Sequence, residues 1–397
     1  MTSWKRVALA MFAVGWGANQ FSSLLVVYRD ELGLSTQTRA ALFGVYAIGL
    51  VPGLLAGGGA SDRWGRRAVS VPFVVLSPVA SLILVLGRDQ FWGLATGRLL
   101  AGICSGVVFS ATSAWVAELS AAEAEGAGAR RAAIALSAGF GAGPLVSGLV
   151  AQFAPHPLWV PYLPHLVLGS AAAVIVLAAP ETVPRGAAEP RAVVRLPHVT
   201  RSARFLFTVA PAAPWVFGAA AISIAFLPGE IGGGSGYAVA FAAVLSGLTL
   251  GTGVVVQPLA RSLDARHPGS AGLAGLAAAT AGTLLAVLAL TLDSHLVLLL
   301  AGFVLGAAYG LCLVSGLRET ERLAPADERG ATIAVYYVLT YVGFAAPYVL
   351  GVLSSAGLGD RGALLVATAA AILAAVLASV SRRRLAPTGE PTPALRS

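Results

Sequence analysis

Long apolar runs, separated by short polar or turn-rich segments, follow one another along nearly the whole chain. A helix needs about 20 mainly apolar residues to cross the hydrocarbon core of a bilayer, and twelve runs are of roughly that length. We therefore predict twelve membrane-spanning helices, at residues 5–28, 38–58, 68–87, 91–117, 132–154, 158–179, 206–227, 236–259, 270–291, 295–317, 331–353 and 362–380. The seventh and eighth are the least sharply bounded, because the turn-rich segment LPGEIGGGSGY lies between them.

Composition supports an all-α integral membrane protein. Of the 397 residues, 57% are hydrophobic and 11% are charged, whereas a soluble domain has about 45–50% apolar and about 25% charged residues. So few charged side chains cannot cover the surface of a soluble protein of this size. The first run ends in YRDELGLS with no small-residue cleavage site, so we expect a retained helix rather than a signal peptide.

The basic residues predict the orientation in the membrane. With the N-terminus in the cytoplasm, 21 of the 26 Lys and Arg residues fall in cytoplasmic segments, four in outer segments and one, Arg98, within a span. Cytoplasmic loops of membrane proteins are enriched in such residues. We expect a multi-pass protein of the cytoplasmic (inner) membrane with both termini inside. The net charge of +8 then reflects topology and does not indicate a nucleic-acid partner.

A long polar stretch in the middle divides the chain into halves. We predict a six-helix bundle at 1–180, a cytoplasmic central loop at 181–205, a second six-helix bundle at 206–381 and a disordered cytoplasmic tail at 382–397. LLAGICSG at 99–106 recurs as LLAGFVLG at 299–306, and RRAAIAL at 130–136 recurs as RGATIAV at 329–335. Two such repeats related by an axis along the membrane normal place a substrate site between them, near the midplane.

The segment GGGASDRWGRR, residues 57–67, gathers an aspartate and three arginines in a chain that has few charges. Glycine gives the backbone the freedom that a tight turn between helices needs. Arginines at the membrane surface can bind headgroups, carboxylates or the carbonyls at helix C-termini. The segment is therefore either a loop that sets topology or an acid–base cluster that holds helix ends together in one conformation.

The spacing within this segment resembles the motif between the second and third helices of the major facilitator superfamily: Gly58-x-x-x-Asp62-Arg63-x-Gly65-Arg66-Arg67. The resemblance extends over the chain, through the twelve spans, the central loop and the duplicated half. It implies two pseudo-symmetric six-helix bundles, with this loop acting as a conformational latch. Glu118 and Arg130 resemble the acid–arginine pair that follows the fourth helix in this family, with solvated loop charges as the alternative.

Two further patterns resemble the proton-coupled drug and metabolite antiporters of that family. GRLLAG places Arg98 inside the fourth span, where a charge costs about 2.5–3.5 kcal/mol at a helix centre and usually serves a pathway or a partner. In the fifth span, Gly139, Gly143, Pro144 and Gly148 combine a small-residue packing face with a proline kink. The resemblance implies export, although Ser147 stands where glycine is common.

The residue that would carry a proton is not evident. No Asp or Glu lies well inside a span, and His165 in the sixth span is the clearly intramembrane histidine, a side chain that titrates near physiological pH. The proton-coupling candidates are Arg98, His165 and Glu230, with Glu118 as a further acid. His165 as a hydrogen-bonded structural residue, and transport by facilitated diffusion, are the alternatives.

The resemblance implies a cavity lined mainly by spans one, four, seven and ten. Polar and aromatic residues expected there, or contributed by spans two and eleven, are Trp16, Asn19, Gln20, Tyr46, Trp215, Tyr309, Tyr336, Tyr337 and Tyr341. Packing between helices or at the interfaces is the alternative for each aromatic residue. A wall of aromatics and amides suits an amphipathic organic molecule and not a metal ion, which needs several oxygen or imidazole ligands.

The sequence thus predicts a secondary transporter, acting as a monomer, that exports a small organic molecule in exchange for protons. Uptake of a sugar or carboxylate by a symporter or uniporter is the first alternative, and a sensor or scaffold without transport is the second. No enzyme motif, cofactor motif or metal spacing is found, and Cys104 and Cys312 lie in apolar runs as expected for buried thiols. The Ala-, Gly- and Arg-rich composition suggests a bacterial source.

Overall fold

The computed structural model describes residues 1–123, 127–183, 197–229, 236–325 and 328–384, without the side chains of 329, 330, 383 and 384. These residues form helices and no strand. Ten helical stretches in the described part are long and apolar enough to cross a membrane. Most of the predicted central loop and tail lie outside the described residues.

The first half contains eight helical elements. They are α1 (Ser3–Asn19), α2 (Phe21–Leu32), α3 (Thr36–Trp64), α4 (Arg66–Leu86), α5 (Phe91–Leu119), α6 (Ala127–Phe153), η1 (Val160–Tyr162) and α7 (Leu163–Val176), where η denotes a short 3₁₀- or π-helical segment. A break at Gln20 separates α1 from α2, which together form the first membrane-spanning stretch. This break positions a residue of the central cavity described below.

The second half is more often interrupted. After η2 (His198–Arg201) come η3 (Phe205–Val209), α8 (Ala210–Ala212), α9 (Pro214–Ala221), η4 (Ile222–Phe226) and η5 (Leu227–Gly229). The rest is formed by α10 (Ala238–Val255), α11 (Gln257–Arg266), α12 (Ser270–Leu292), α13 (His295–Leu323), α14 (Arg329–Val342), η6 (Gly343–Ala345), α15 (Ala346–Leu353), η7 (Ser354–Leu358) and α16 (Gly359–Arg384).

The helices correspond to the twelve predicted runs with two differences. The apolar helix at 160–176 is shorter than the others, and residues 331–382 form one continuous stretch. That stretch is broken at Gly357, whose φ of 104° is not helical. Dividing it there matches a described helix to every predicted run, while the count of twelve spans and the side of the termini stay predictions.

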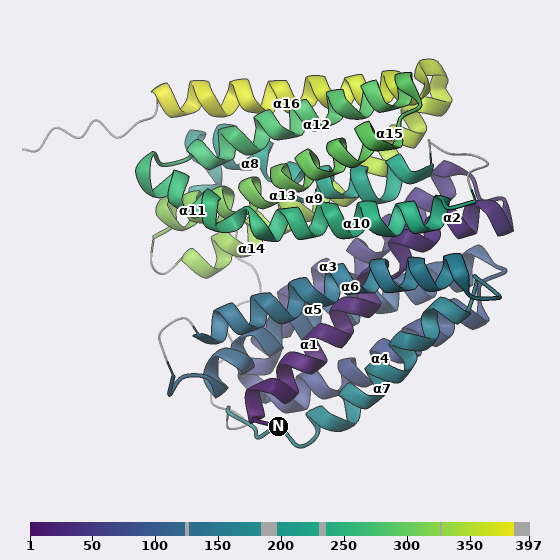
Figure 1. The fold of residues 1–397 in the computed structure, drawn as a ribbon. Coiled ribbons are helices and arrows are strands. Elements are labelled where there is room, and N and C mark those ends of the chain that lie inside the picture. Colours follow the sequence, from purple (N-terminus) through teal and green to yellow (C-terminus); the bar gives the residue numbers. More distant parts are fainter. Residues whose placement is uncertain (124–126, 184–196, 230–235, 326–327, 385–397) are drawn as a thin grey trace, which may run out of the picture.

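Figure 1 shows two groups of helices, α1–α7 and α8–α16, that lie one above the other. They converge at the end that carries α2 and diverge towards the end that carries the N-terminus and α11. We call the first the Arg29 end, after Arg29 in α2, and the second the Asp62 end, after Asp62 in α3. The sequence predicts that the Asp62 end is cytoplasmic.

Glycine allows neighbouring helices to pack backbone to backbone in both halves. A Cβ on Gly102 in α5 would overlap the carbonyl oxygen of Tyr46 in α3, and one on Gly306 in α13 would overlap that of Thr249 in α10. In the repeated segments LLAGICSG and LLAGFVLG the position equivalent to Gly306 is Gly106, where a Cβ would overlap the carbonyl oxygen of Leu50, also in α3. Small residues at such contacts are the usual means of close helix packing in membranes.

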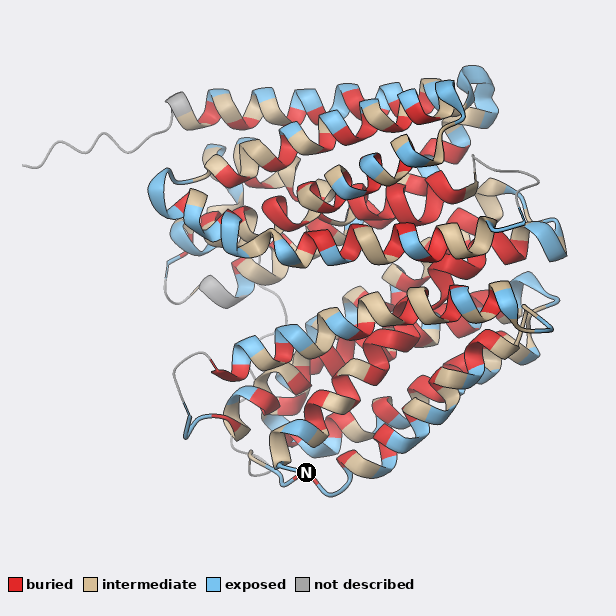
Figure 2. Cartoon of the chain, in the orientation of Figure 1, coloured by how far each residue is buried: buried red, intermediate tan, exposed pale blue. Residues whose placement is uncertain are grey.

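Burial follows the faces on which the helices meet. Figure 2 shows buried residues on the inward faces and exposed residues on the outward faces of the peripheral helices. The exposed side chains include large apolar ones such as Val167 (72% exposed) and Leu296 (77%). Extensive exposed apolar surface marks a contact with membrane or partner, and here it suits acyl chains. Cys104 and Cys312 are free thiols and buried, as the sequence predicts.

Candidate functional site: a central aromatic cavity

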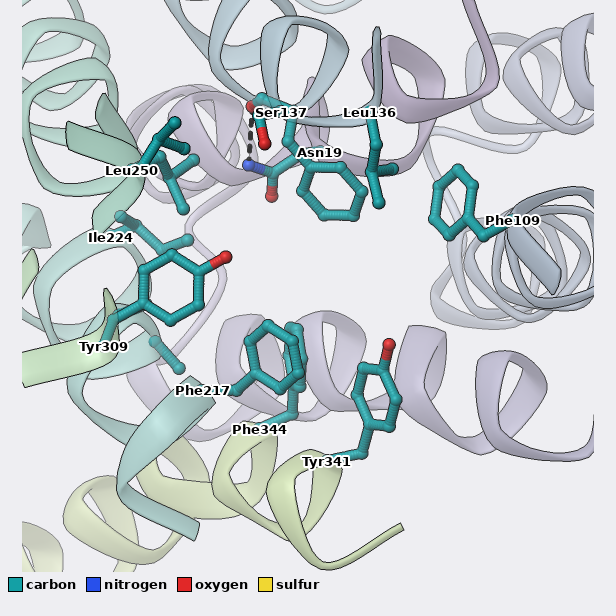
Figure 3. A pocket seen from close by; sticks show the side chains of 14 residues that line it. Asn19, Phe109, Leu136, Ser137, Phe217, Ile224, Leu250, Tyr309, Tyr341 and Phe344 are labelled. Carbon is teal, nitrogen blue, oxygen red and sulfur yellow. Dashed lines mark hydrogen bonds between the residues drawn. The ribbon is translucent and has the colours of Figure 1, made fainter. Parts of the chain in front are cut away.

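A cavity lies between the two halves, lined by residues of α1, α5, α6, α9, η4, α10, α13, α14 and η6 (Figure 3). About 90 Å³ of it is accessible to the centre of a water molecule. The space between the lining side chains, counted together with the open solvent that it joins, is about 680 Å³.

Aromatic side chains dominate the lining: Phe109, Phe140, Phe217, Tyr309, Tyr341 and Phe344. Phe217 stands at the centre of the second-half group, since its ring stacks with Tyr341 at a centroid distance of 4.7 Å and an interplanar angle of 13°. Tyr309 stacks on the same ring at 5.8 Å and 30°. The second half thus presents roughly parallel rings to the cavity.

Hydrogen-bonding groups are few and uncharged. Asn19, the last residue of α1, donates from Nδ2 to the carbonyl oxygen of Phe140 at 3.0 Å. Its amide oxygen points into the open space in Figure 3, as do the hydroxyls of Tyr309 and Tyr341. Ser137 adds a hydroxyl from α6, and none of the described side chains that line the cavity carries a charge.

Three of the nine predicted cavity residues line it, namely Asn19, Tyr309 and Tyr341. Phe109, Phe140, Phe217 and Phe344 also line it and were not predicted, because a phenylalanine in an apolar run cannot be told from a residue that packs between helices. The sequence does contain a signal for one of them, Phe344. Phe344 lies three residues after Tyr341, a spacing that places both on the same helical face.

The prediction is wrong for Trp16, Gln20 and Tyr46, which are buried and do not line the cavity. Tyr46 packs beside Phe344 at a ring distance of 6.0 Å. Gln20 lies at the helix break and donates to Ser81 Oγ at 2.7 Å. One residue along a helix rotates a side chain by about 100°, which separates Gln20 from its cavity-lining neighbour.

The predicted cavity lining is also wrong for the remaining three aromatic residues. Tyr336 is buried within the second half, where its hydroxyl donates to the carbonyl oxygens of Cys312 (3.2 Å) and Leu313 (3.1 Å). Tyr337, half-buried, packs against Tyr336 at 5.8 Å and does not line the cavity. Trp215 lines a different, apolar groove between α9, α15 and α16. It lies two residues from Phe217 and therefore on nearly the opposite face of the helix.

Arg98 is buried beside the cavity rather than in it, with 2% of its surface exposed. Its guanidinium donates to the carbonyl oxygens of Ala18 at 2.9 Å, Leu42 at 3.2 Å and Phe43 at 3.3 Å. It also lies over the ring of Tyr46, 4.7 Å from the centroid, an arrangement that stabilises a cation. Arg98 lies near the start of α5, and a long side chain there can extend its charge towards the membrane surface. Its guanidinium instead stays inside the protein.

His165 is likewise enclosed within the first half. Its Nδ1 lies 2.8 Å from Ser81 Oγ, and its Nε2 lies 3.5 Å from Ser77 Oγ. Because Gln20 donates to the same Ser81 hydroxyl, the three side chains form a chain of hydrogen bonds that begins next to Asn19. Glu230, the third proton-coupling candidate, lies outside the described residues.

The motif at the Asp62 end is organised by Arg66, which is 7% exposed. Its guanidinium contacts Asp62 Oδ1 at 2.5 Å, Glu118 Oε1 at 2.7 Å and Ser61 Oγ at 2.7 Å. Glu118 also accepts a hydrogen bond from Thr182, at 2.5 Å. The motif therefore joins the ends of α3, α4 and α5 to the segment that follows α7.

Glycine is required at the turn between α3 and α4. Gly65 has a φ of 100°, and a Cβ at this position would lie 2.6 Å from Glu181 Oε2. Glu181 accepts from the backbone N–H groups of Arg66 (2.8 Å) and Arg67 (2.9 Å), at the N-terminus of α4. Arg63 and Arg67 are exposed, whereas Gly58 packs close to Ser110.

Glu118 and Arg130 do not form the expected pair. Glu118 binds Arg66, while Arg130 is exposed on α6. Gly128 packs against α5, so Arg130, about 200° further round the helix, points away from it. Arg131 instead pairs with Glu123, and its hydrogen bond lowers the pKa of that carboxyl.

The glycines of the antiporter-like segment lie at helix contacts. A Cβ on Gly143 would lie 2.5 Å from the carbonyl oxygen of Trp16, and Gly139 approaches α1 at least as closely one turn earlier. A Cβ on Gly148 would lie 2.5 Å from the Cβ of Ala243 in α10. This face of α6 therefore contacts α1 and, through Gly148, the second half of the protein.

Hydrogen bonds join the halves at the Arg29 end. Arg29 donates to the carbonyl oxygen of Gly229 at 2.6 Å. Gln152 in α6 donates to the carbonyl oxygen of Gly236 at 2.7 Å and accepts from the N–H of Ala240 at 3.0 Å. First-half side chains thus bind second-half backbone at the end where the two halves converge (Figure 1).

No group of three or more His, Cys, Asp or Glu side chains that could hold a metal ion occurs among the described residues. Two helical bundles around an uncharged central cavity, joined at one end and apart at the other, define a class of protein. That class is the membrane transporters built from two repeats with the substrate site between them.

The sequence matches the Major Facilitator Superfamily over residues 7–345, so the chain belongs to this superfamily. Solved structures with the same fold include the nucleoside transporter NupG, with a TM-score of 0.76, 13% identity and coverage of 96% of this chain and 98% of that one. A POT family transporter in complex with 5-aminolevulinic acid has a TM-score of 0.76 at 14% identity, with 96% of each chain covered.

A bacterial homologue of the human lysosomal transporter Spinster, in an inward-facing and unoccupied conformation, gives a TM-score of 0.70 at 14% identity, with 96% of each chain covered. No curated protein matches the sequence. Membership of the superfamily and these neighbours make the protein a multi-pass membrane protein and a secondary transporter of a small molecule.

Proposed function

We propose that the protein exports a small amphipathic organic molecule across the cytoplasmic membrane, by alternating access and in exchange for protons. The observation that carries the substrate class is the lining of the cavity, which lies between the two halves, is rich in aromatic rings and carries no charge. A carboxylate substrate would need a cation in the lining, and the guanidinium of Arg98 is already bound to three backbone carbonyls.

The closed Arg29 end and the divergent Asp62 end suit one state of an alternating-access cycle (Figure 1). If the Asp62 end is cytoplasmic, this state is open to the cytoplasm and able to load a substrate for export. In the other state the halves close at the Asp62 end. The cluster around Arg66 would then act as the conformational latch, since it fixes the helix ends that must meet the second half.

Proton coupling is proposed on the resemblance of the Arg98 and Gly139–Gly148 segments to those of proton antiporters. The hydrogen-bonded chain from Gln20 through Ser81 to His165 begins next to Asn19 in the cavity, and it supports a route by which protonation could affect binding. The cavity is complete within one chain, which supports a monomer as the working unit. Uptake of a nutrient by the same fold is the alternative.

The direct test uses inside-out membrane vesicles that contain the protein, energised so that their interior is acidic and reported by a pH-sensitive dye. Addition of an uncharged aromatic compound should release protons. Vesicles with Arg98→Lys test the coupling residue, and substrate exchange without a pH gradient serves as their control. Loss of proton release with retained exchange would support coupling through Arg98. If none of a panel of such compounds releases protons, with folded protein present, proton-driven export is contradicted.

A further inference from the structure

We propose that the substrates are flat, uncharged aromatic molecules, and that the protein discriminates against permanently charged cations of the same shape. This inference rests on the proposed function and narrows its substrate class. Three observations carry it: the parallel rings of the second half, the amide and hydroxyl groups opposite them, and the electrostatics of the lining.

The rings around Phe217 form the surface on which a flat molecule would stack. Tyr341 lies at 13° and Tyr309 at 30° to the Phe217 ring, with centroid distances of 4.7 and 5.8 Å. Phe344 adds a fourth ring, 5.2 Å from Phe217 and tilted by 39°. Aromatic rings prefer offset-stacked or edge-to-face contacts with other rings. A planar aromatic ligand can therefore extend this array, whereas a bulky aliphatic molecule lacks the ring contacts that would do so.

The first half faces these rings with two phenyl groups and two polar ones. Phe109 and Phe140 lie 5.5 Å apart at 50°. Asn19 uses one N–H on the carbonyl oxygen of Phe140, which leaves its amide oxygen and second N–H for a ligand. With Ser137, this wall offers one or two directional hydrogen bonds. A ring nitrogen or carbonyl of a heterocycle would satisfy them.

The lining disfavours a cation. None of its described residues is an Asp or Glu that could pair with one. Arg98 donates to the carbonyl oxygen of Ala18, the residue that precedes Asn19, and so places a buried positive charge behind this wall. A buried charge is poorly screened and costly without an opposite partner. The aromatic faces alone attract a cation by about 0.5–2 kcal/mol, which is less than the usual cost of burying an unpaired ion.

A matched pair of probes tests the inference. Acridine is uncharged at mildly alkaline pH, and N-methylacridinium has the same ring system with a permanent charge. Both would be titrated, by their own fluorescence, into the full-length protein in nanodiscs, with empty nanodiscs as the blank. We expect acridine to bind at least about tenfold more tightly, a difference of about 1.4 kcal/mol.

Ring stacking is tested with Phe217→Leu, which keeps an apolar side chain but removes the ring. Acridine binding should weaken by about 3–10-fold, the range of an aromatic pair. Phe303→Leu is the control, because Phe303 on α13 is 47% exposed and does not line the cavity. Tyr341→Leu replaces the first variant if that variant does not fold.

Equal or tighter binding of N-methylacridinium would overturn the inference, and so would acridine binding that neither ring variant weakens. Binding of neither probe would overturn it as well. The compound that binds is then tested in the vesicle assay. Flux of the cation would leave the proposed transport standing and reject only the substrate class, whereas a bound compound that is never transported would reject the proposed function.

Discussion

At the scale of single residues, Arg98 and Arg66 show how the first half accommodates charge. Both guanidiniums are largely buried, but Arg98 is bound by backbone carbonyls whereas Arg66 is bound by two carboxylates. Arginine suits both positions because its planar group offers five donors in a fixed arrangement. We therefore expect substitutions of the two residues to affect stability for different reasons.

Arg98→Lys should lower the free energy of unfolding by about 1–3 kcal/mol, because a single ammonium cannot reach three carbonyl oxygens that diverge around it. Thermal unfolding in detergent measures the change. Arg130→Lys, at an exposed position, is the control and should shift stability by less than about 0.5 kcal/mol. Equal stability of the two variants would show that the carbonyl contacts contribute little.

Arg66→Gln should destabilise the Asp62 end by about 1–3 kcal/mol, because Glu118 and Asp62 lose their charged donor. The effect is expected at the lower end of this range, since both carboxylates are partly exposed. Arg63→Gln, exposed in the same segment, is the matched comparison. If both variants unfold at the same temperature, the cluster is not a structural latch.

At the scale of helices, close backbone contacts decide which pairs form. The α3–α5 and α10–α13 contacts use glycine at equivalent positions of the two halves, at Gly106 and Gly306, and Gly102 adds a second close contact between α3 and α5. Bilayer lipids are as apolar as leucine, so helix association depends on packing rather than on the hydrophobic effect. The repeated LLAG segments are therefore a packing signature of the fold rather than a substrate motif.

Gly102→Ala should separate α3 from α5 and lower stability by about 1–3 kcal/mol, the usual range for an overpacked core. Gly141→Ala tests the same change where a Cβ meets nothing within 4 Å. That variant should be neutral or stabilised by about 0.4–1 kcal/mol. Thermal unfolding of the pair distinguishes a packing effect from a general intolerance of alanine.

At the scale of the whole molecule, the halves are joined at the Arg29 end by hydrogen bonds between first-half side chains and second-half backbone groups. Each bond contributes about 0.5–1.5 kcal/mol, so a few of them hold the closed state without making it permanent. In these bonds the second half contributes only backbone groups, which a side-chain substitution there does not remove. The first-half donors, which include Arg29, Gln37 and Gln152, are therefore the side chains at which a substitution can weaken this closure.

Gln152→Ala should shift the population towards a state that is open at the Arg29 end, because both of its hydrogen bonds to the second half are lost. The expected change is about fivefold or more in the ratio of states, since about 1 kcal/mol corresponds to that factor. Spin-label distances across this end measure it. An unchanged distribution would mean that other contacts determine closure.

The sequence predicts the architecture well and the cavity only in part. Apolar run length and charge bias depend on the bilayer and can be read locally, which is why the helices match the predicted runs. The side chains of a cavity depend on helix rotation. An error of two residues separates Trp215, in an outer groove, from Phe217, at the centre of the cavity. Likewise, no spacing reveals that Glu118 pairs with Arg66 rather than Arg130.

The central claim is that the two halves alternate around the cavity, and paired distances test it most directly. Spin labels at Ala122 and Arg266 report the Asp62 end, and labels at Asp30 and Leu292 report the Arg29 end, all on exposed positions. Cys104 and Cys312 would first be replaced. We predict two distance populations at each end, with opposite shifts when acridine is added in nanodiscs. A single unchanged distance at both ends would contradict transport by alternating access and favour a static sensor or scaffold.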